Sequence, residues 1–526
     1  MTRMVTNSPK AAPVAPPGHP GAAPRGGLDR WFEISHRGST VAREVRGGLV
    51  TFFAMAYILA LNPIIIGAAT DKRGLLLSGQ PKFLDAAQKN IDWAAVHHSQ
   101  LMVAGVTALV AAVMTVAMGV WGRYPLGIAT GLGLNALLAY TIAPTMTWPQ
   151  AMGLVVWEGV GIAIAVLSGF RQAVFKAVPP ALRTAISVGI GLFITFVGLM
   201  DSGVVRKPGG SVPVELGING SLQGWPIAIV VIGFFIVVLL FVKRVKGAML
   251  ISIVATTVIA LIVQALANVG PMFGADGTVK PTGWELNVPT LPHASDFGLP
   301  KLGLLGKVDL FGAFAPDGRF HISIVLGVLL IVFSLMLADF FDTMGTVVAI
   351  GQEGGLLNNQ GNPPHLKEIL LVDSLAAVAG GLGSSSSNTA YIESASGVGE
   401  GARTGLASVV TGAAFFVAMF LTPLVNMVPS EAVAPVLVLV GFLMMTQVLH
   451  VRWDDVEDGI PAFLTIALMP FTYSITVGIG AGFITYALIK LVKGKARQVH
   501  PLMWGISVAF VIYFAQGILS SLISRI

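Results

Sequence analysis

The chain consists largely of apolar segments that are long enough to cross a lipid bilayer, and this feature decides its fold class. A transmembrane helix needs about 20 mainly apolar residues, and about fourteen such segments follow one another in the sequence. Their approximate ranges are 47–69, 100–121, 125–143, 149–169, 180–200, 224–242, 247–266, 321–351, 366–382, 386–402, 405–425, 430–449, 459–493 and 501–523. Only 11% of the residues are charged, against roughly a quarter in soluble proteins. We therefore predict an all-α polytopic membrane protein.

The apolar segments form two series of seven, separated by a polar stretch at residues 268–319. Seven crossings leave the second series inverted relative to the first, as in the inverted repeats of many transporters. We expect residues 44–266 to form the first repeat (spans 1–7) and residues 321–523 the second (spans 8–14). Segment 459–493 is counted as one crossing, although a break at Pro470 would divide it into two shorter helices.

The N-terminal region indicates how the protein is oriented. Residues 1–28 are rich in Pro, Ala and Gly, lack the apolar region of a signal peptide and are predicted to be a disordered tail. Arginines cluster around the start of span 1, so the positive-inside rule places the tail in the cytoplasm and residues 268–319 outside a multi-pass cell-membrane protein. These are Arg25, Arg30, Arg37, Arg43 and Arg46.

The composition also excludes some partners. Other basic residues lie mainly in short loops, which predicts no nucleic-acid partner. The absence of cysteine excludes a disulfide or a Cys-ligated metal.

Two carboxylates interrupt the apolar character of span 8. Asp339 and Asp342 lie in the stretch ADFFDTMGT, and their i, i+3 spacing places both on one face of a helix. An ionisable residue at membrane depth is costly and usually functional. This pair is therefore our first candidate for substrate binding and proton coupling.

Spans 3 and 10 are too polar or too glycine-rich for unbroken helices facing lipid. Span 3 contains GLGLNALLAY with Asn135, and span 10 contains GGLGSSSSNTAYIESASGVGEG with Glu393. We predict that each has a short extended segment followed by a half-helix, which starts near Asn135 in span 3 and near Tyr391 in span 10. Such irregular backbone is tolerated where it lines a cavity, and the two half-helix N-termini would face a polar substrate.

The polar groups around this predicted site suit a flat, neutral ligand that forms hydrogen bonds, such as a nucleobase. Asn135 offers donors and an acceptor, the three acids offer acceptors or carry a proton, and Phe341 offers an aromatic face. The span 10 residues Asn388 and Thr389 complete the predicted substrate-binding set. No metal-ligand spacing and no cofactor motif is recognised.

Some of these residues also have structural interpretations. Glu158 in span 4 could reach the site, but a tie between helices explains it equally well. Asp373 at the start of span 9 is better explained as a helix N-cap than as a ligand. Gly131 and Gly133 are consistent both with close helix packing and with an extended break beside Asn135.

At these residues the chain closely resembles the adenine/guanine/hypoxanthine permeases, the AzgA-like branch related to nucleobase-ascorbate transporters. The resemblance extends from about Glu44 to Leu519. Its motifs are GGLVTFFAMAYILALNP from Gly47, GLGLNALLAY from Gly131, ADFFDTMGT from Ala338, TAYIESASGVGEGARTGL from Thr389 and IPAFLTIALMPFTYSI from Ile460. Several long motifs in the same order are far more specific than one short motif.

The resemblance implies a core domain of spans 1–4 and 8–11, a gate domain of spans 5–7 and 12–14, and a homodimer that works by an elevator-like movement. It also implies that Asn135, Asp339, Asp342 and Glu393 contact the purine or couple its transport.

We expect import of hypoxanthine, guanine and adenine by proton symport, because one of the three clustered acids would hold a proton near neutral pH. Alternatives with the same fold are a uracil or xanthine permease and an anion transporter. The three membrane acids argue against an anion pathway. A channel gives no reason for an acid cluster, and an enzyme would need a catalytic motif that the sequence does not present.

Overall fold

The computed structural model describes residues 26–85, 90–168, 177–208, 212–273, 278–292, 297–316, 318–358 and 362–523. Of the predicted tail, residues 1–25 lie outside the described residues, and residues 27 and 28 begin helix α1 (Gly27–Phe32). Within the described residues, ten helices are long and apolar enough to cross a membrane. The protein is therefore an all-helical multi-pass membrane protein, as the composition predicts.

The first half of the chain contains helices at all seven predicted spans, and two of the spans are interrupted. Span 1 is divided at Ala56 and Tyr57, and span 3 begins with a strand. The elements are α2 (Val41–Met55), α3 (Ile58–Gly67), α4 (Trp93–Ala117), η1 (Met118–Gly122), β1 (Ile128–Thr130), α5 (Leu132–Ala136), η2 (Leu137–Ile142), η3 (Ala143–Thr145), α6 (Trp148–Leu167), α8 (Pro180–Asp201), α9 (Trp225–Val242) and α10 (Ala248–Ala267). Strands β2 (Val205–Arg206) and β3 (Glu215–Leu216) pair in the loop after α8.

The second half repeats this order of elements, including an early strand in its third span. Its elements are α11 (Ile322–Gly354), α12 (Leu366–Leu382), β4 (Asn388–Ala390), α13 (Ser394–Gly399), α14 (Gly405–Ala418), η5 (Met419–Met427), α15 (Ser430–Met445), η6 (Thr446–His450), α16 (Val456–Phe471), α17 (Ile475–Val492), η7 (Ala496–Gln498) and α18 (Pro501–Ile523). If interrupted spans are counted once, α16 and α17 are the sixth and seventh spans of the second half, and α18 follows them without a counterpart in the first half.

The prediction of one crossing over residues 459–493 is wrong, because the structure divides this segment into α16 and α17. Tyr473 between them has a left-handed backbone with φ of 54°. Ser474 then caps α17 by accepting a hydrogen bond from the Val477 N–H at 3.3 Å. Glu457 at the start of α16 pairs with Lys490 at the end of α17, so the two helices run antiparallel. The break near Pro470 that the sequence offered as an alternative is the one observed.

Strands β1 and β4 form a two-stranded sheet at the centre of the molecule and join its two halves. They pair antiparallel, with Ala129 opposite Thr389 and Thr130 opposite Asn388. All six strand residues are buried. Because each strand interrupts a span, this pairing satisfies backbone groups that no helix satisfies there.

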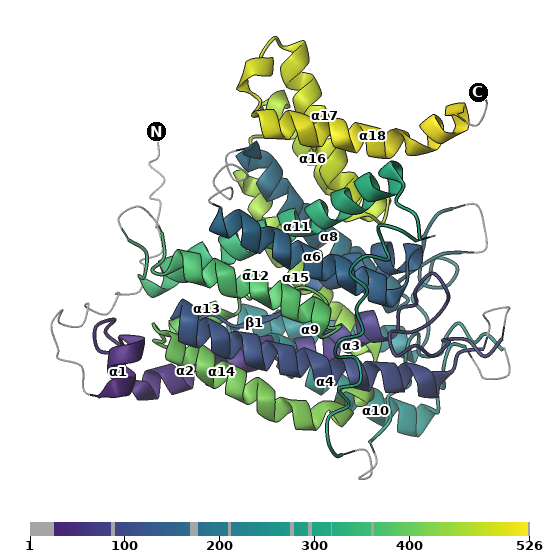
Figure 1. Ribbon diagram of the computed structural model, residues 1–526. Helices are drawn as coiled ribbons and strands as arrows, with labels where there is room; N and C mark the ends of the chain where they lie inside the picture. The colour runs from purple at the N-terminus through teal and green to yellow at the C-terminus, as the bar shows by residue number, and fades with distance from the viewer. Residues whose placement is uncertain are drawn as a thin grey trace, which may run out of the picture.

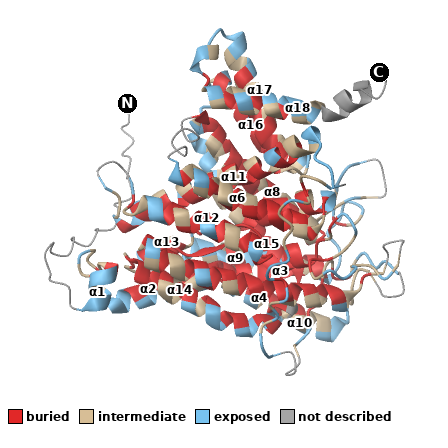
Figure 2. Cartoon of the chain, viewed as in Figure 1, coloured by how far each residue is buried: buried red, intermediate tan, exposed pale blue. Residues whose placement is uncertain are grey.

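The helices pack in two groups. Helices α16, α17 and α18 stand at one end of the molecule (Figure 1). In the larger group, α6 packs on α12, α14 on α2 and α4, and α13 on α2. In the smaller group, α8 packs on α15 and α16, α9 on α10 and α15, and α16 on α17. Contacts between the groups are sparse and involve mainly α11, α5 and α2. Buried residues occupy the interior of both groups, and exposed residues lie toward the outside (Figure 2).

Contacts of the loops define two faces of the molecule. On the face where α2 begins, which we call the N-terminal face, Ser39 Oγ donates to the Gly401 carbonyl at 3.1 Å. On the opposite face, which we call the loop face, the segment between α10 and α11 covers the starts of α6 and α15. There the Asp309 N–H donates to the Pro149 carbonyl at 2.8 Å, and Asn287 Nδ2 donates to the Val428 carbonyl at 2.8 Å.

Candidate functional site

The pairing of β1 with β4 positions the two predicted half-helices. Helix α5 begins at Leu132 and α13 begins at Ser394. The predicted starts, near Asn135 and Tyr391, are therefore each three residues from the observed ones. Asn135 lies inside α5, where its N–H donates to the Gly131 carbonyl at 2.8 Å. Glu393 occupies the N-cap position of α13, at the positive end of that short helix.

Two of the predicted acids form a partly exposed cluster, which we call the open pair. Asp342 on α11 lies within electrostatic range of Glu393, and both side chains are only partly buried. The Tyr57 hydroxyl donates to Glu393 Oε1 at 2.6 Å. The Tyr391 ring lies 6.4 Å from the Tyr57 ring, and its hydroxyl donates to the Thr130 carbonyl at 2.5 Å. The open pair is thus framed by two tyrosines.

The third predicted acid belongs to a fully buried cluster, which we call the sealed cluster. Asp339 is 0% exposed and lies within electrostatic range of Glu158 on α6 and Asp373 on α12. Within the described residues, neither oxygen of Asp339 has a partner in strict hydrogen-bonding geometry, although the Thr389 side chain is close enough to influence its carboxylate. Asp339 is also within electrostatic range of Asp342. It therefore connects the sealed cluster with the open pair.

Hydroxyl groups tie the sealed cluster to strand β4. Thr343 Oγ1 lies 2.9 Å from both oxygens of Asp373 and 2.7 Å from Thr389 Oγ1. Ser387 Oγ donates to Glu158 Oε1 at 3.0 Å. Glu158 thus reaches the residue immediately before β4. Asp373 lies in the middle of α12, so its interpretation as an N-cap is wrong.

The two candidate asparagines differ in how many of their polar atoms are satisfied. Asn135 is 0% exposed, and among the described residues neither its Oδ1 nor its Nδ2 has a partner. Asn388 Nδ2 donates to the Ser386 carbonyl at 3.0 Å, whereas its Oδ1 has no partner in the described chain. A buried amide with unsatisfied donors and acceptors costs free energy. Asn135 is therefore available to a polar ligand.

Phe341 lies where the larger group meets the smaller group. Its ring packs edge-to-face on Phe340 at 5.3 Å. The Arg183 guanidinium of α8 lies over the Phe341 ring, 6.0 Å from the ring centre. Gly133 of α5 also meets α8, because a Cβ on this glycine would lie 2.3 Å from Ile190 Cγ2. The structure thus supports the close-packing interpretation of Gly133.

The sequence offered no signal for one residue of this site. Tyr57 is an isolated tyrosine in an apolar segment, and it lies at the break between α2 and α3, which no glycine or proline marks. A group of three or more residues arranged to hold a metal ion is not found among the described residues.

Two interrupted helices that meet at a buried polar centre are typical of secondary transporters. The model of the Permease family, Xan_ur_permease, matches residues 89–481. The chain belongs to this family, and it is a transporter rather than an enzyme.

The guanine/hypoxanthine permease PbuG of Bacillus subtilis (strain 168) is 35% identical over 489 residues, 93% of this chain and 99% of that protein. The adenine permease AdeP of Escherichia coli (strain K12) is 33% identical over 490 residues, 93% of this chain and 96% of that protein. These relatives confirm the resemblance to purine permeases.

A similar solved structure is the transmembrane domain of a cyanobacterial bicarbonate transporter, BicA. It has a TM-score of 0.52 and 16% identity, and the match covers 84% of this chain and 97% of that chain. At this identity the likeness concerns the fold alone.

Proposed function

We propose that this protein imports the purine nucleobases hypoxanthine, guanine and adenine across the cell membrane by proton symport. The observation that carries the proposal is the open pair of Asp342 and Glu393. It lies at the start of α13, beside the β1–β4 sheet. It occurs in a chain whose relatives are named guanine/hypoxanthine and adenine permeases. In this proposal the N-terminal face lies in the cytoplasm.

The proposed substrate contacts follow from the polar atoms that remain available. Glu393 accepts hydrogen bonds from the purine ring, and Asn135 supplies the donors and the acceptor that the fold leaves unsatisfied. Phe341 offers an aromatic face, while Asn388 and Thr389 supply polar groups from β4. Together these groups match a flat ligand with donors and acceptors along its edges.

The proposed coupling proton resides on the acids. Two carboxylates close together in a medium of low polarity repel each other strongly, so a proton shared by the open pair relieves that repulsion. Asp339 lies within range of this pair and is the third carrier in the proposal. A membrane potential of about 100 mV provides roughly 2.3 kcal/mol per proton, or about fiftyfold accumulation of purine. One proton per purine is therefore sufficient.

The proposed movement is an elevator-like displacement of the larger group, acting as core domain, against the smaller group, acting as gate domain. The sparse contacts between the groups support it. On the N-terminal face, Lys246 of the α9–α10 loop pairs with Glu400 at the end of α13. Toward the loop face, the Tyr140 hydroxyl donates to Asp201 Oδ2 at 2.7 Å. Both contacts would have to break during transport. A homodimer is part of the proposal on the basis of the family resemblance.

The test is uptake of labelled hypoxanthine into proteoliposomes with and without an inward proton gradient. Adenine, guanine, uracil, xanthine and bicarbonate serve as competitors. We expect gradient-stimulated uptake that adenine and guanine inhibit. Inhibition by uracil, xanthine or bicarbonate alone, or uptake that is indifferent to the gradient, would contradict the proposal.

A further inference from the structure

A cavity of about 680 Å³ opens in the smaller group. Its lining residues belong to other segments of the chain than strands β1 and β4. It lies where α8 and α18 begin and where α15 with η6 and α17 end. Because α15 begins at the loop face, its end lies on the N-terminal face. The lining includes Arg452, Asp458, Lys490, Arg497 and His500. None of them belongs to the proposed purine site.

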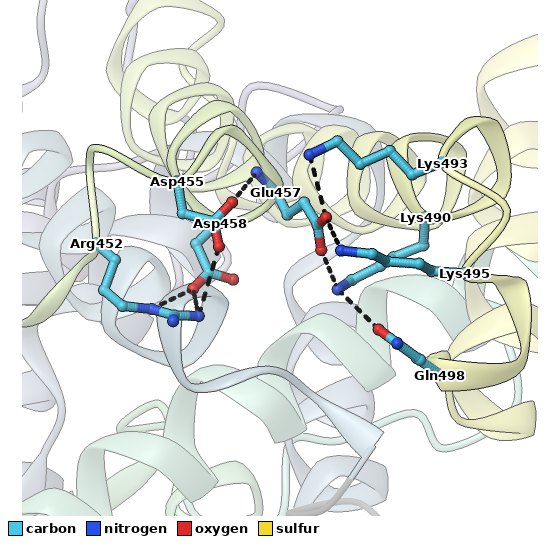
Figure 3. A network of polar contacts seen from close by, with 8 residues as sticks. All are labelled: Arg452, Asp455, Glu457, Asp458, Lys490, Lys493, Lys495 and Gln498. Atoms are coloured by element: carbon cyan, nitrogen blue, oxygen red, sulfur yellow. Dashed lines mark hydrogen bonds and ion pairs between the residues drawn. The ribbon is translucent and has the colours of Figure 1, made fainter.

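Cationic groups outnumber carboxylates in and beside this cavity (Figure 3). Glu457 is approached by the ammonium groups of Lys490, Lys493 and Lys495. One carboxylate neutralises only one of these three charges. The cluster therefore has an excess of positive charge beside the cavity wall.

The acids near Arg452 reduce this excess but do not cancel it. Among the described residues, Asp458 is the only carboxylate in the cavity lining, and Arg452 contacts its Oδ2 at 3.0 Å and 2.5 Å. Arg452 also lies 3.8 Å from Asp455 Oδ2. Arg497 also lines the cavity, is exposed, and has no ion-pair partner in the described part of the chain. Its guanidinium is thus free to bind an anion.

Neutral donors and helix ends favour the same kind of ligand. The Leu502 N–H donates to His500 Nδ1 at 3.2 Å, so the proton of a neutral His500 is on Nε2, which is left as a donor. Helices α8 and α18 both begin at the cavity, with Pro180 and Pro501 in its lining. The positive ends of two long helix dipoles therefore add to the side-chain charges.

We propose that this cavity binds a phosphate ester, whose oxygens are held by Arg497, Lys490 and His500. The volume lies within the usual range for small-molecule sites and exceeds what a bare phosphate ion needs. Leu449 and Val492 near the cavity are 84% and 79% exposed, which would place acyl chains beside a phospholipid headgroup. Basic pockets between membrane helices bind such headgroups on the cytoplasmic side. A soluble phosphate ester such as a nucleoside monophosphate has the same recognition chemistry.

The test measures the thermal unfolding midpoint of the protein purified in an uncharged, phosphate-free detergent, with and without added phosphatidylglycerol, and with soluble AMP or inorganic phosphate. We expect phosphatidylglycerol or AMP to raise the midpoint by roughly 2 °C or more. A rise with inorganic phosphate alone would contradict the assignment of an ester. A rise with phosphatidylglycerol identifies a lipid site, and a rise with AMP identifies a soluble-ester site. The absence of a rise with every probe would overturn the proposal.

Variants distinguish the cavity from general surface charge. Arg497→Gln breaks no ion pair within the described part of the chain. It should weaken binding roughly tenfold or more, whereas Arg497→Lys should restore part of it. Arg244→Gln, which removes an exposed charge from the α9–α10 loop on the same face, is the matched control. Equal losses in Arg497→Gln and Arg244→Gln would overturn the proposal. Binding is measured without transport, so the result is independent of the purine assay.

Discussion

The open pair and the sealed cluster lie side by side in the larger group but are built differently. Asp342 and Glu393 are partly exposed, and within the described residues Tyr57 supplies the side-chain hydrogen bond to this pair. Glu158 and Asp373 are fully buried and are held by Ser387 and Thr343. This difference supports the proposal that Asp342 and Glu393 serve the substrate. We propose that Glu158 and Asp373 instead hold strand β4 in position, because a buried carboxylate requires fixed donors.

The largest expected effect separates the open pair from other acids. Glu393→Gln keeps the side-chain size but removes the ionisable oxygen, so proton-driven uptake should fall by roughly tenfold to 150-fold, since hydrogen bonds to charged groups contribute about 1.5–3 kcal/mol. Glu368→Gln, at an exposed position in the first turn of α12, should leave uptake unchanged. Uptake rates normalised to protein in the membrane provide the measurement. Similar rates for both variants would remove the distinction.

A smaller effect is expected when only the framing tyrosine changes. Tyr57→Phe removes the hydroxyl that donates to Glu393 and leaves the ring in place. The apparent affinity for hypoxanthine should fall about fivefold to thirtyfold, with little change in thermal stability. Tyr513→Phe, on α18, is the matched control. If Tyr57→Phe lowered stability without changing affinity, Tyr57 would belong with the structural residues.

The sealed cluster should respond in stability rather than in affinity. Thr343→Val removes the side-chain donor to Asp373 and leaves that buried carboxyl with the backbone of Ala390 as its remaining donor, which should cost about 1–3 kcal/mol. Thr343→Ser keeps the hydroxyl and should remain close to the wild-type stability. Thermal unfolding in detergent measures both variants. An unchanged midpoint for Thr343→Val, combined with lost purine affinity, would assign the sealed cluster to the substrate.

The smallest expected effect concerns the ion pair between the two helix groups. Lys246→Gln removes the contact with Glu400, and because the lysine side chain is 52% exposed the change should be about 0.2–1 kcal/mol and screened by salt. Uptake rates should therefore change less than about fivefold. The difference from wild type should shrink as ionic strength rises. A large effect that salt does not alter would show that this contact is more than a surface ion pair.

The sequence predicts the membrane class, the interrupted spans and the acids, because charge in an apolar segment is a strong physical signal. It fails where tertiary contacts decide. Tyr57 has no polar pattern around it, and its role depends on a break in span 1 that no glycine or proline marks. Asp373 resembles an N-cap until α12 is seen to begin seven residues earlier. The α16–α17 hairpin depends on a left-handed Tyr473 that an apolar profile does not reveal.

Coupling of purine transport to protons is tested most directly by the electrical current that hypoxanthine evokes in proteoliposomes at equal pH on both sides. Proton symport of a neutral purine through the open pair predicts a positive inward current in the wild type. The current should be largely lost in Glu393→Gln and retained in Glu368→Gln. A wild type that transports hypoxanthine without current, or a Glu393→Gln variant with undiminished current, would contradict the proposal that the open pair couples purine to protons.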